Sequence, residues 1–324
     1  MAKAQQQRTR ANEGIKGSQT RRTRAANTRP PSRAHWVAPL TLAALILFSL
    51  LVWWMMSSFA GNNSADTASS IQPIAALDSP DFHSLLVDPQ DPEHLLFGSH
   101  AGIQESRDGG ITWEDGELRN ADAMQLASSP KAPETLYATG HDVFQASHDS
   151  GQTWQPVAHN LPGTDIHGFA QDPTDPRRLY ALVMGAGTFT SADGGTTWQP
   201  LPTQPSGDGM HIALAASAGS LYAATDRGLM VSRDGGQSWQ ALPSQPSGEI
   251  ISLAAPVSDP QLLYAGTSTG LAKSTNGGES WTNLGPESVS VLAVAVTPSD
   301  PNRVFLLSDA GAVYRSVDAG VTWR

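Results

Sequence analysis

Two kinds of apolar segment follow one another along the chain. The first is a single run of twenty residues without a charge, at 37–56. A helix of that length is about 30 Å long, which matches the hydrocarbon thickness of a bilayer, so the run predicts one membrane-spanning helix over residues 36–57. From residue 71 onward the apolar runs are short and are separated by Gly, Pro and Asp, which predicts β-strands joined by turns.

The region from residue 71 onward repeats one unit six times. An eight-residue motif, S-R-D-G-G-I-T-W in its first copy at 106–113, returns at spacings of 41, 44, 41, 42 and 42 residues. Each unit is too short to alternate strands with helices, and turn residues recur about every 8–12 positions, which indicates four antiparallel strands. We call these strands a to d, from the axis outward. Their runs are apolar at consecutive positions because neighbouring sheets cover both faces of each sheet.

Six four-stranded sheets around one axis form a β-propeller. The sequence therefore predicts an all-β fold, a six-bladed β-propeller of four-stranded blades over residues 71–324, preceded by one N-terminal transmembrane helix. The last unit ends at Trp323 without a strand d. The segment 71–77, I-Q-P-I-A-A-L, resembles the strand d segments of other units, such as Q-P-L-P-T-Q at 199–204. We expect it to complete the sixth blade and close the ring.

The eight-residue motif, called the octet below, has the composition of a turn between strands c and d. Its third residue accepts hydrogen bonds from backbone amides of the turn, its fifth is a Gly that adopts positive φ, and its eighth is a Trp that anchors the turn in the core. The fourth residue is treated as variable, as in the last copy, where it is Ala319. The third and eighth residues, which we expect to be structural, are Asp108, Trp113, Asp149, Trp154, Asp193, Trp198, Asp234, Trp239, Asn276, Trp281, Asp318 and Trp323.

The charge of the chain is divided between its two ends. The formal net charge is −10, but residues 1–35 hold nine Lys and Arg against Glu13 alone, a net of +8, so the other 289 residues carry −18. Lys and Arg are retained on the cytoplasmic side of a membrane helix. We therefore expect a single-pass protein of the cell (inner) membrane, with a basic disordered cytoplasmic tail over 1–35, a flexible linker over 58–70 and a periplasmic or extracellular propeller. The alternative is a signal peptide cleaved after Ala60.

Composition excludes several kinds of chemistry. The chain has no Cys, which excludes disulfides, thiolate nucleophiles and zinc-thiolate sites. The basic tail has no aromatic residue before Trp36 for base stacking, so we expect no nucleic acid as a partner of the chain. The lipid bilayer is the expected partner, through residues 37–56. There is no Gly-x-Ser-x-Gly elbow, and the Gly-rich stretch 185–187 lies in a turn between strands rather than before a helix.

The six octets resemble the Asp-box, or bacterial neuraminidase repeat. This repeat is found in sialidases, in sortilin-type receptors, in other glycoside hydrolases and in a photosystem II assembly factor. The resemblance covers residues 71–324 and implies a propeller in which the octets are structural and lie away from the active face. It does not imply one function, because the superfamily has several.

A sialidase is the enzyme that this resemblance suggests first. Sialidases bind the substrate carboxylate with three arginines and use a tyrosine nucleophile. Four of the five tyrosines occupy the same position of strand b in successive units, and the fifth, Tyr314, lies on strand c beside the last octet. The Arg-Ile-Pro signature is absent. We therefore expect no sialidase. The four repeated residues are Tyr137, Tyr180, Tyr222 and Tyr264.

Residues that break the repeat are the candidates for function. Asp and His recur together at the start of strand a in three units, and His, Asp and Arg occur in the turns between strands b and c. In a propeller both places open on one face, at the mouth of the central channel, opposite the octets. We predict a binding site there, formed by Asp81, His83, His100, His141, Asp165, His167, Asp208, His211, Asp226 and Arg227.

Two interpretations of this channel mouth stay open. Neutral imidazoles and carboxylates suit recognition of a ligand or metal, whereas an Asp before a strand also commonly caps a turn. The second unit has D-A-M at 122–124 and the fifth has E-I-I at 249–251, which breaks any regular coordination. We therefore assign no metal and no cofactor from the sequence.

The function we expect is binding. The chain would serve as a membrane-anchored scaffold for a protein or glycan partner, with a monomeric propeller, in envelope or complex assembly, as the assembly-factor branch of the resemblance implies. The alternative is an enzyme, a glycoside hydrolase of the exo-sialidase-like kind with catalytic carboxylates at the channel mouth.

Overall fold

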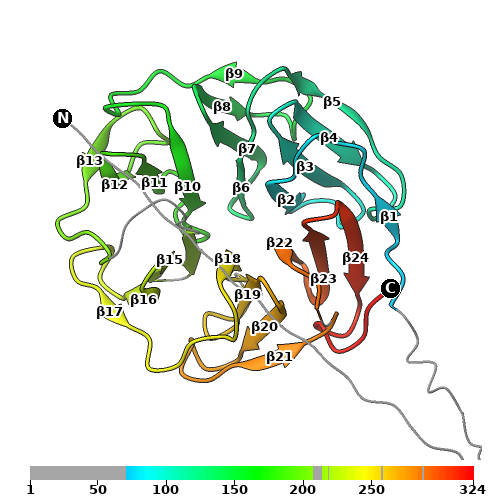
Figure 1. Cartoon of the computed structure of the whole chain (residues 1–324). Helices are drawn as coiled ribbons and strands as arrows, with labels where there is room; N and C mark the ends of the chain where they lie inside the picture. Colours follow the sequence, from blue (N-terminus) through cyan, green and yellow to red (C-terminus); the bar gives the residue numbers. More distant parts are fainter. Residues whose placement is uncertain (1–70, 207–213, 218, 257, 287) are drawn as a thin grey trace, which may run out of the picture. The chain divides into compact units, whose positions relative to one another are not determined.

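The computed structural model describes residues 71–206, 214–217, 219–256, 258–286 and 288–324. Within these residues 24 strands form six antiparallel sheets of four strands each. Figure 1 shows the sheets arranged around a central axis, with β2, β6, β10, β18 and β22 innermost among the labelled strands. The predicted all-β, six-bladed propeller with four-stranded blades is confirmed.

In blades one to five the strands follow one another in the sequence from the axis outward. Blade one consists of β2 (Ser84–Val87), β3 (Leu95–Ser99), β4 (Gly102–Ser106) and β5 (Glu114–Arg119). Blade two consists of β6 (Gln125–Ser129), β7 (Ala132–Gly140), β8 (Val143–Ser147) and β9 (Gln155–Pro156). Blade three consists of β10 (Ile166–Gln171), β11 (Leu179–Val183), β12 (Gly187–Ser191) and β13 (Trp198–Pro200).

Blades four and five have the same order, and in blade six only the outermost strand departs from it. Blade four consists of β14 (Leu214–Ser217), β15 (Ser220–Thr225), β16 (Gly228–Ser232) and β17 (Gln240–Ala241). Blade five consists of β18 (Ile250–Ala254), β19 (Leu263–Thr267), β20 (Gly270–Ser274) and β21 (Thr282–Leu284). Blade six consists of β22 (Val291–Thr297), β23 (Asp300–Ser308), β24 (Ala312–Ser316) and β1 (Ala75–Ala76).

Blade six takes its outer strand from the other end of the propeller sequence. β1 pairs with β24 in antiparallel register, Ala75 opposite Val313 and Ala76 opposite Ala312. The Leu77 amide extends the pairing by donating to the Gly311 carbonyl at 2.8 Å. Figure 1 shows β1, in blue, beside the red β24. The segment 71–77 thus lies where the sequence analysis placed it, and the sheet edge of β24 is covered.

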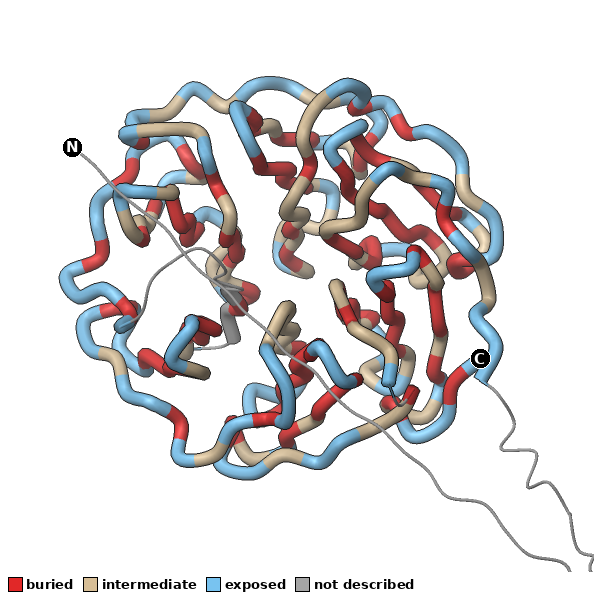
Figure 2. The backbone as a smooth tube through the Cα atoms, in the orientation of Figure 1, coloured by how far each residue is buried: buried red, intermediate tan, exposed pale blue. Residues whose placement is uncertain are grey.

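The core lies between neighbouring sheets. β3, β11 and β19, the second strands of blades one, three and five, are buried at every position, whereas the outer strands β9 and β17 are exposed. Figure 2 shows buried positions concentrated within the blades and exposed turns around the outside of the ring. Phe97 of blade one packs in one cluster with Phe305 and Leu307 of blade six. Each blade is therefore stabilised by apolar burial against its neighbours.

The octets form the turns between strands c and d, as predicted. In the first octet Asp108 Oδ1 accepts the Thr112 amide at 2.9 Å, and Trp113 Nε1 donates to the Gly110 carbonyl at 3.0 Å. The sequence analysis assigned no role to the leading Ser, yet Ser106 Oγ donates to Asp108 and accepts the Gly110 amide, both at 2.9 Å. The bond from this Ser to the third residue recurs in all six octets at 2.7–2.9 Å.

The fourth octet residue is more constrained than the sequence analysis assumed. The fifth residue is Gly with φ of 87–98° in all six octets, as expected. The fourth residue also has positive φ, 68–81° where it is Gly, 57° at Ser150 and 58° at Ala319. The residue type at this position varies as expected, but the structure adds a constraint, because non-glycine residues are strained in the left-handed region.

The predicted transmembrane helix over 36–57, the tail over 1–35 and the linker over 58–70 lie outside the described residues. In the part of the chain that the structure describes, no helix has the length and apolar character needed to cross a membrane.

Candidate functional site

Six of the ten predicted site residues meet at one end of blades one to three. Together with Asp122 they form a continuous group, which we call the His–Asp arc: Asp81, His83, His100, Asp122, His141, Asp165 and His167. Its Asp residues precede or begin the innermost strands, and His100 and His141 lie in the turns between the second and third strands. The octets are at the other end of the third strands, so the arc and the octets lie on opposite faces.

The remaining predicted residues lie outside the arc. Asp226 and Arg227 are in the turn between β15 and β16 of blade four, where the Arg227 amide donates to Thr225 Oγ1 at 3.1 Å. Asp208 and His211 lie outside the described residues. The four tyrosines of the repeated position are buried, as expected for core residues: Tyr137, Tyr180, Tyr222 and Tyr264.

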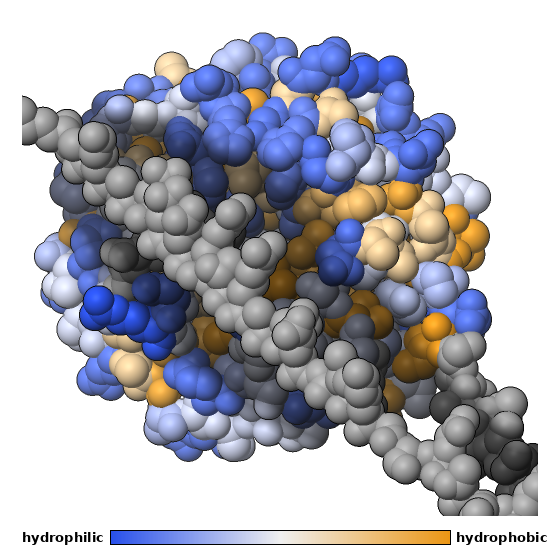
Figure 3. Space-filling view, viewed as in Figure 1, coloured by the Kyte–Doolittle hydropathy of each residue, from blue (hydrophilic) through white to orange (hydrophobic). Residues whose placement is uncertain are grey.

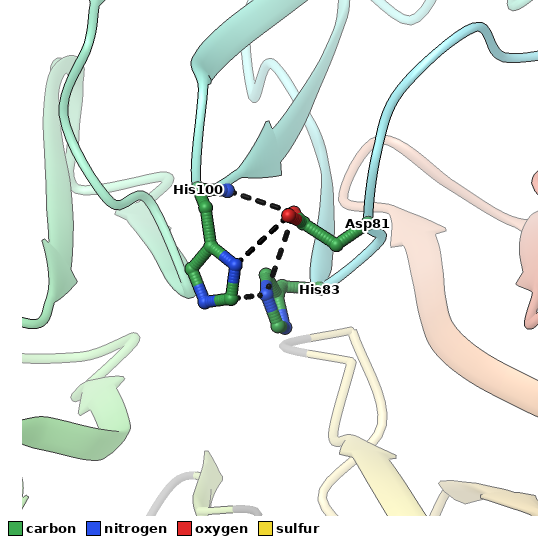
Figure 4. A group of neighbouring side chains, drawn as sticks. All are labelled: Asp81, His83 and His100. Atoms are coloured by element: carbon green, nitrogen blue, oxygen red, sulfur yellow. Dashed lines mark hydrogen bonds and ion pairs between the residues drawn. The ribbon is translucent and has the colours of Figure 1, made fainter.

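The first part of the arc belongs to blade one (Figure 4). Asp81 Oδ1 accepts the His100 backbone amide and Asp81 Oδ2 accepts the His100 ring Nδ1–H, both at 2.8 Å. His83 Nε2 lies 3.1 Å from His100 Nε2 and 3.5 Å from Asp81 Oδ1. Since the Asp81 carboxylate holds the proton of His100 on Nδ1, the neutral His100 ring presents an unprotonated Nε2 to His83.

Blade two repeats this arrangement with Asp122 and His141. Asp122 Oδ2 accepts the His141 ring Nδ1–H and the His141 backbone amide, the latter at 3.2 Å. The same oxygen lies 3.6 Å from His100 Nε2 and so joins the two blades. The Asp122 side chain is 11% exposed, and its other oxygen is buried without a hydrogen-bond partner among the described residues.

Asp122 is the arc residue that sequence reasoning missed. It precedes the innermost strand of its blade, as Asp81 and Asp165 do. The signal was therefore present in the sequence. Ala123 and Met124 follow Asp122, however, so the Asp-x-His pair is incomplete in this unit.

Blade three completes the arc. His167 Nε2 lies 2.8 Å from Asp165 Oδ1 and 3.2 Å from His141 Nε2, and His141 Nε2 lies 3.4 Å from Asp165 Oδ1. The Asp122 carboxylate holds the His141 proton on Nδ1, so the His141 Nε2 lone pair faces both His167 and Asp165. Three ligand-type atoms of two blades thus meet within 3.4 Å of one another.

Burial and charge act on the innermost histidine of the arc. Burial lowers the pKa of His83, and the neighbouring His100 lowers it further, against the opposing effect of Asp81. The neutral imidazole is therefore the favoured form of His83 at neutral pH.

The arc borders a central cavity of about 650 Å³. Residues of the innermost strands of all six blades line it, and most are apolar, such as Leu86, Leu126 and Leu253. His83 and His167 of the arc also line it. Figure 3 shows hydrophobic atoms in the hollow of the ring where the grey trace leaves it in view, with hydrophilic atoms around it. A polar, half-exposed rim over an apolar cavity is a common form of ligand site.

A further histidine, held between two carboxylates, lies in blade one away from the arc. His94 is buried between Asp88, at 2.9 Å from its Nδ1, and Glu105, at 3.1 Å from its Nε2. Burial lowers the pKa of His94, but the hydrogen bonds to the two carboxylates outweigh it and raise the pKa to about 9. His94 is therefore a buried cation that ties the turn after β2 to β4, and sequence reasoning gave no sign of it.

Comparisons with known proteins agree with the propeller fold. The model of the Sortilin-Vps10 family (Sortilin, neurotensin receptor 3) matches residues 141–248, about a third of the chain. None of the curated protein sequences compared with the chain matches it.

Solved structures with a similar fold include proteins of different kinds. YCF48 from Cyanidioschyzon merolae is 19% identical, with a TM-score of 0.52, over 77% of this chain and 87% of that chain. YCF48 bound to D1 peptide is 22% identical, with a TM-score of 0.50, over 79% of this chain and 86% of that chain. The GH74 enzyme from Niastella koreensis is 18% identical, with a TM-score of 0.56, over 79% of this chain and 46% of that chain. At these identities the likeness shows that the chain is a β-propeller of this general kind.

Proposed function

We propose that the chain is a membrane-anchored propeller outside the cytoplasm that binds a protein partner at the channel mouth and acts as a scaffold in envelope or complex assembly. One observation carries the proposal. The chemistry that differs from blade to blade is gathered in the His–Asp arc on one face, whereas the octets on the other face repeat the same hydrogen bonds six times. Recognition needs positions that differ, and a repeated turn supplies stability.

The geometry of the mouth suits a peptide segment. His100, His141 and Asp165 have side chains about half exposed, so a partner reaches them directly. Beneath them the cavity of about 650 Å³ offers apolar surface to a side chain of the partner. The carboxylates of the arc favour a segment that carries positive charge or hydrogen-bond donors.

Two likenesses support this interpretation. The octets resemble the Asp-box, which implies a structural turn away from the active face. YCF48, a propeller of similar fold, has been solved bound to a peptide, the D1 peptide. A peptide bound at the channel mouth, on the face opposite the octets, is consistent with both likenesses.

The anchor is part of the proposal. The uncharged run 37–56 has the length of a membrane helix, and the nine basic residues before it favour a cytoplasmic N-terminus. External protease applied to intact spheroplasts should then digest the propeller and leave a tag at the N-terminus intact. A protected propeller would contradict the orientation.

Site-specific photo-crosslinking tests the binding face. A photo-reactive residue is placed at position 125, which lines the cavity, and in a matched variant at position 233, in an octet of the opposite face. In membranes that hold the full chain, we expect a defined protein adduct from position 125 and none from position 233. Adding His100→Ala and His141→Ala should reduce that adduct several-fold. An adduct formed from position 233 alone, or one indifferent to the two substitutions, would overturn the proposal.

A further inference from the structure

We infer that the part of the arc between blades two and three binds one divalent transition-metal ion of the zinc class. The ligands are His141 Nε2, His167 Nε2 and one carboxylate oxygen of Asp165. This site is independent of the proposed partner, because it rests on the geometry of three side chains and not on what else the mouth binds.

The spacing of the three atoms fits a metal. They lie 3.2, 3.4 and 2.8 Å apart. Metal–ligand bonds of about 2.0–2.1 Å place neighbouring ligands about 2.9 Å apart at right angles and about 3.4 Å apart in a tetrahedron. The three side chains are therefore already at ligand spacing. Two imidazoles and one carboxylate on one side of an ion are a donor set typical of zinc, iron, cobalt and nickel.

The positions of the protons on the two imidazole rings indicate which nitrogen atoms can bind an ion. The Asp122 carboxylate keeps the His141 proton on Nδ1, so His141 Nε2 offers a lone pair. His167 Nε2 faces that lone pair and the Asp165 oxygen, so a single Nε2–H of His167 is shared between them. A cation takes the place of this proton, which moves to Nδ1 of the same ring. Both imidazoles then bind as neutral ligands, with no change in the total number of protons.

Asp122 acts as a positioning residue for His141. A carboxylate that accepts the far N–H of a metal-bound imidazole fixes its tautomer and orientation. Asp122 does this from a buried position and also accepts the His141 backbone amide, so it holds both the ring and the turn. The Asp165 carboxylate is differently placed. The corresponding turn of blade three, 184–186, has no histidine, so this carboxylate is left to face His141 and His167.

The part of the arc in blades one and two lacks one of the groups needed for this ligand set. Both oxygens of Asp81 already accept hydrogen bonds from His100. At the position where blade three supplies His167, blade two supplies Met124. Among the described residues, the complete set of two imidazoles and a carboxylate not already bound to a turn histidine occurs once, so we expect the arc to bind one ion.

Metal titration of the purified full chain in detergent, without a polyhistidine tag and after EDTA treatment, tests the inference. Calorimetry with Zn²⁺ should show one equivalent bound, and Co²⁺ should give visible absorption bands that Zn²⁺ abolishes. His141→Ala and His167→Ala should each weaken Zn²⁺ binding at least 100-fold. Asp122→Asn should weaken it about 10–100-fold, as loss of a carboxylate behind a ligand histidine does.

His148→Ala is the matched control. His148 lies in the octet of the same blade as His141 and contacts Thr135 at 3.3 Å, so removing it deletes an imidazole without touching the arc. It should leave Zn²⁺ affinity unchanged, and the metal-free melting temperature of each variant checks that it folds. The inference fails if the folded full chain binds no Zn²⁺, or if His141→Ala and His167→Ala bind like the unaltered chain. It also fails if His83→Ala abolishes binding and His167→Ala does not.

Discussion

The face that carries the octets and the face that carries the His–Asp arc lie at opposite ends of the third strand of each blade. β4 begins at Gly102, beside His100, and ends at Ser106, the first residue of an octet. At the Ser106 end the bond from the leading Ser to the third octet residue recurs in every blade. At the His100 end, among the described residues, blades one to three each have an Asp before the innermost strand but differ in which histidines they supply.

This difference separates stability from recognition within one repeat. An octet closes its own turn through a buried Ser, whose hydrogen bonds to the third and fifth octet residues are local and recur in each blade. The arc links residues of different blades, as where Asp122 of blade two faces His100 of blade one. Substitutions on the octet face should therefore change the free energy of unfolding, and substitutions on the arc should change binding.

Removing an octet tryptophan should have the largest effect. Trp198 is 4% exposed and packs against Phe144 and Phe169, and its Nε1–H donates to the Gly195 carbonyl at 2.7 Å. Trp198→Ala should lower the free energy of unfolding by about 3–5 kcal/mol, the usual cost of deleting a buried Trp.

His167→Ala supplies the comparison in the same blade, on the arc face. It should cost less than about 1 kcal/mol, because the substitution lies outside the apolar core. The free energies of unfolding of both variants are measured by chemical denaturation with EDTA present. Equal losses for the two variants would contradict the division between the faces.

The buried cation His94 should make stability depend on pH. Its pKa is about 9 in the folded chain against 6.5 for a free histidine, so the protonated form stabilises the fold. That contribution is complete below pH 6.5 and is lost as the pH rises through 9, on the order of 3 kcal/mol in all.

Denaturation of the unaltered chain between pH 6 and pH 9.5 measures this loss. His94→Gln should be less stable at pH 6 and should show a flatter profile, because the titrating group is gone. Identical slopes of stability against pH for the two chains between pH 6.5 and pH 9 would show that His94 does not carry the charge.

His83 should have the opposite effect on stability. Its pKa is lowered in the folded chain, so the free energy of unfolding should fall as the pH drops below 6.5.

The sequence was sufficient for the fold because the signals of a propeller are local. The period of the octets set the number of blades, and turn residues between short apolar runs set four strands in each. Ring closure followed from the match between segment 71–77 and the outer strands. The role of the octet Ser was missed because Ser is common in turns and its buried hydroxyl is visible only in the folded turn.

The site was predicted as a set of residues but not as an arrangement. The sequence placed Asp81 and His100 on one face. It did not show that Asp81 and Asp122 each hold the turn histidine of their own blade, while the next blade supplies a further carboxylate. That relation depends on the angle between neighbouring sheets, which no local pattern encodes. His94 was missed for a similar reason, since its partners Asp88, in the turn after β2, and Glu105, in β4, meet only by packing.

A smaller effect is expected where an octet departs from its own pattern. Ala319 has a φ of 58° at a position that is Gly in four of the octets. Ala319→Gly removes the strain of a left-handed alanine but gives the unfolded chain more freedom, so it should raise the free energy of unfolding by about 0.5–1 kcal/mol.

Gly320→Ala is the matched change at the next residue. Gly320 has a φ of 91°, and an added Cβ would lie 2.7 Å from Leu284 Cδ1. This substitution should destabilise the chain, and a stabilising result would show that the octet backbone is not held as described.

The smallest effect on stability should come from the arc itself, and it is the most informative. His100 and His141 are nearly half exposed, and Asp81 and Asp122 keep their backbone hydrogen bonds to both turns when the rings are removed. The double variant His100→Ala and His141→Ala should therefore unfold within about 0.5 kcal/mol of the unaltered chain when EDTA is present. The same variant should lose both the Zn²⁺ equivalent and most of the crosslinked adduct from position 125. A loss of several kcal/mol would instead mean that the arc, like the octets, serves to hold the blades together.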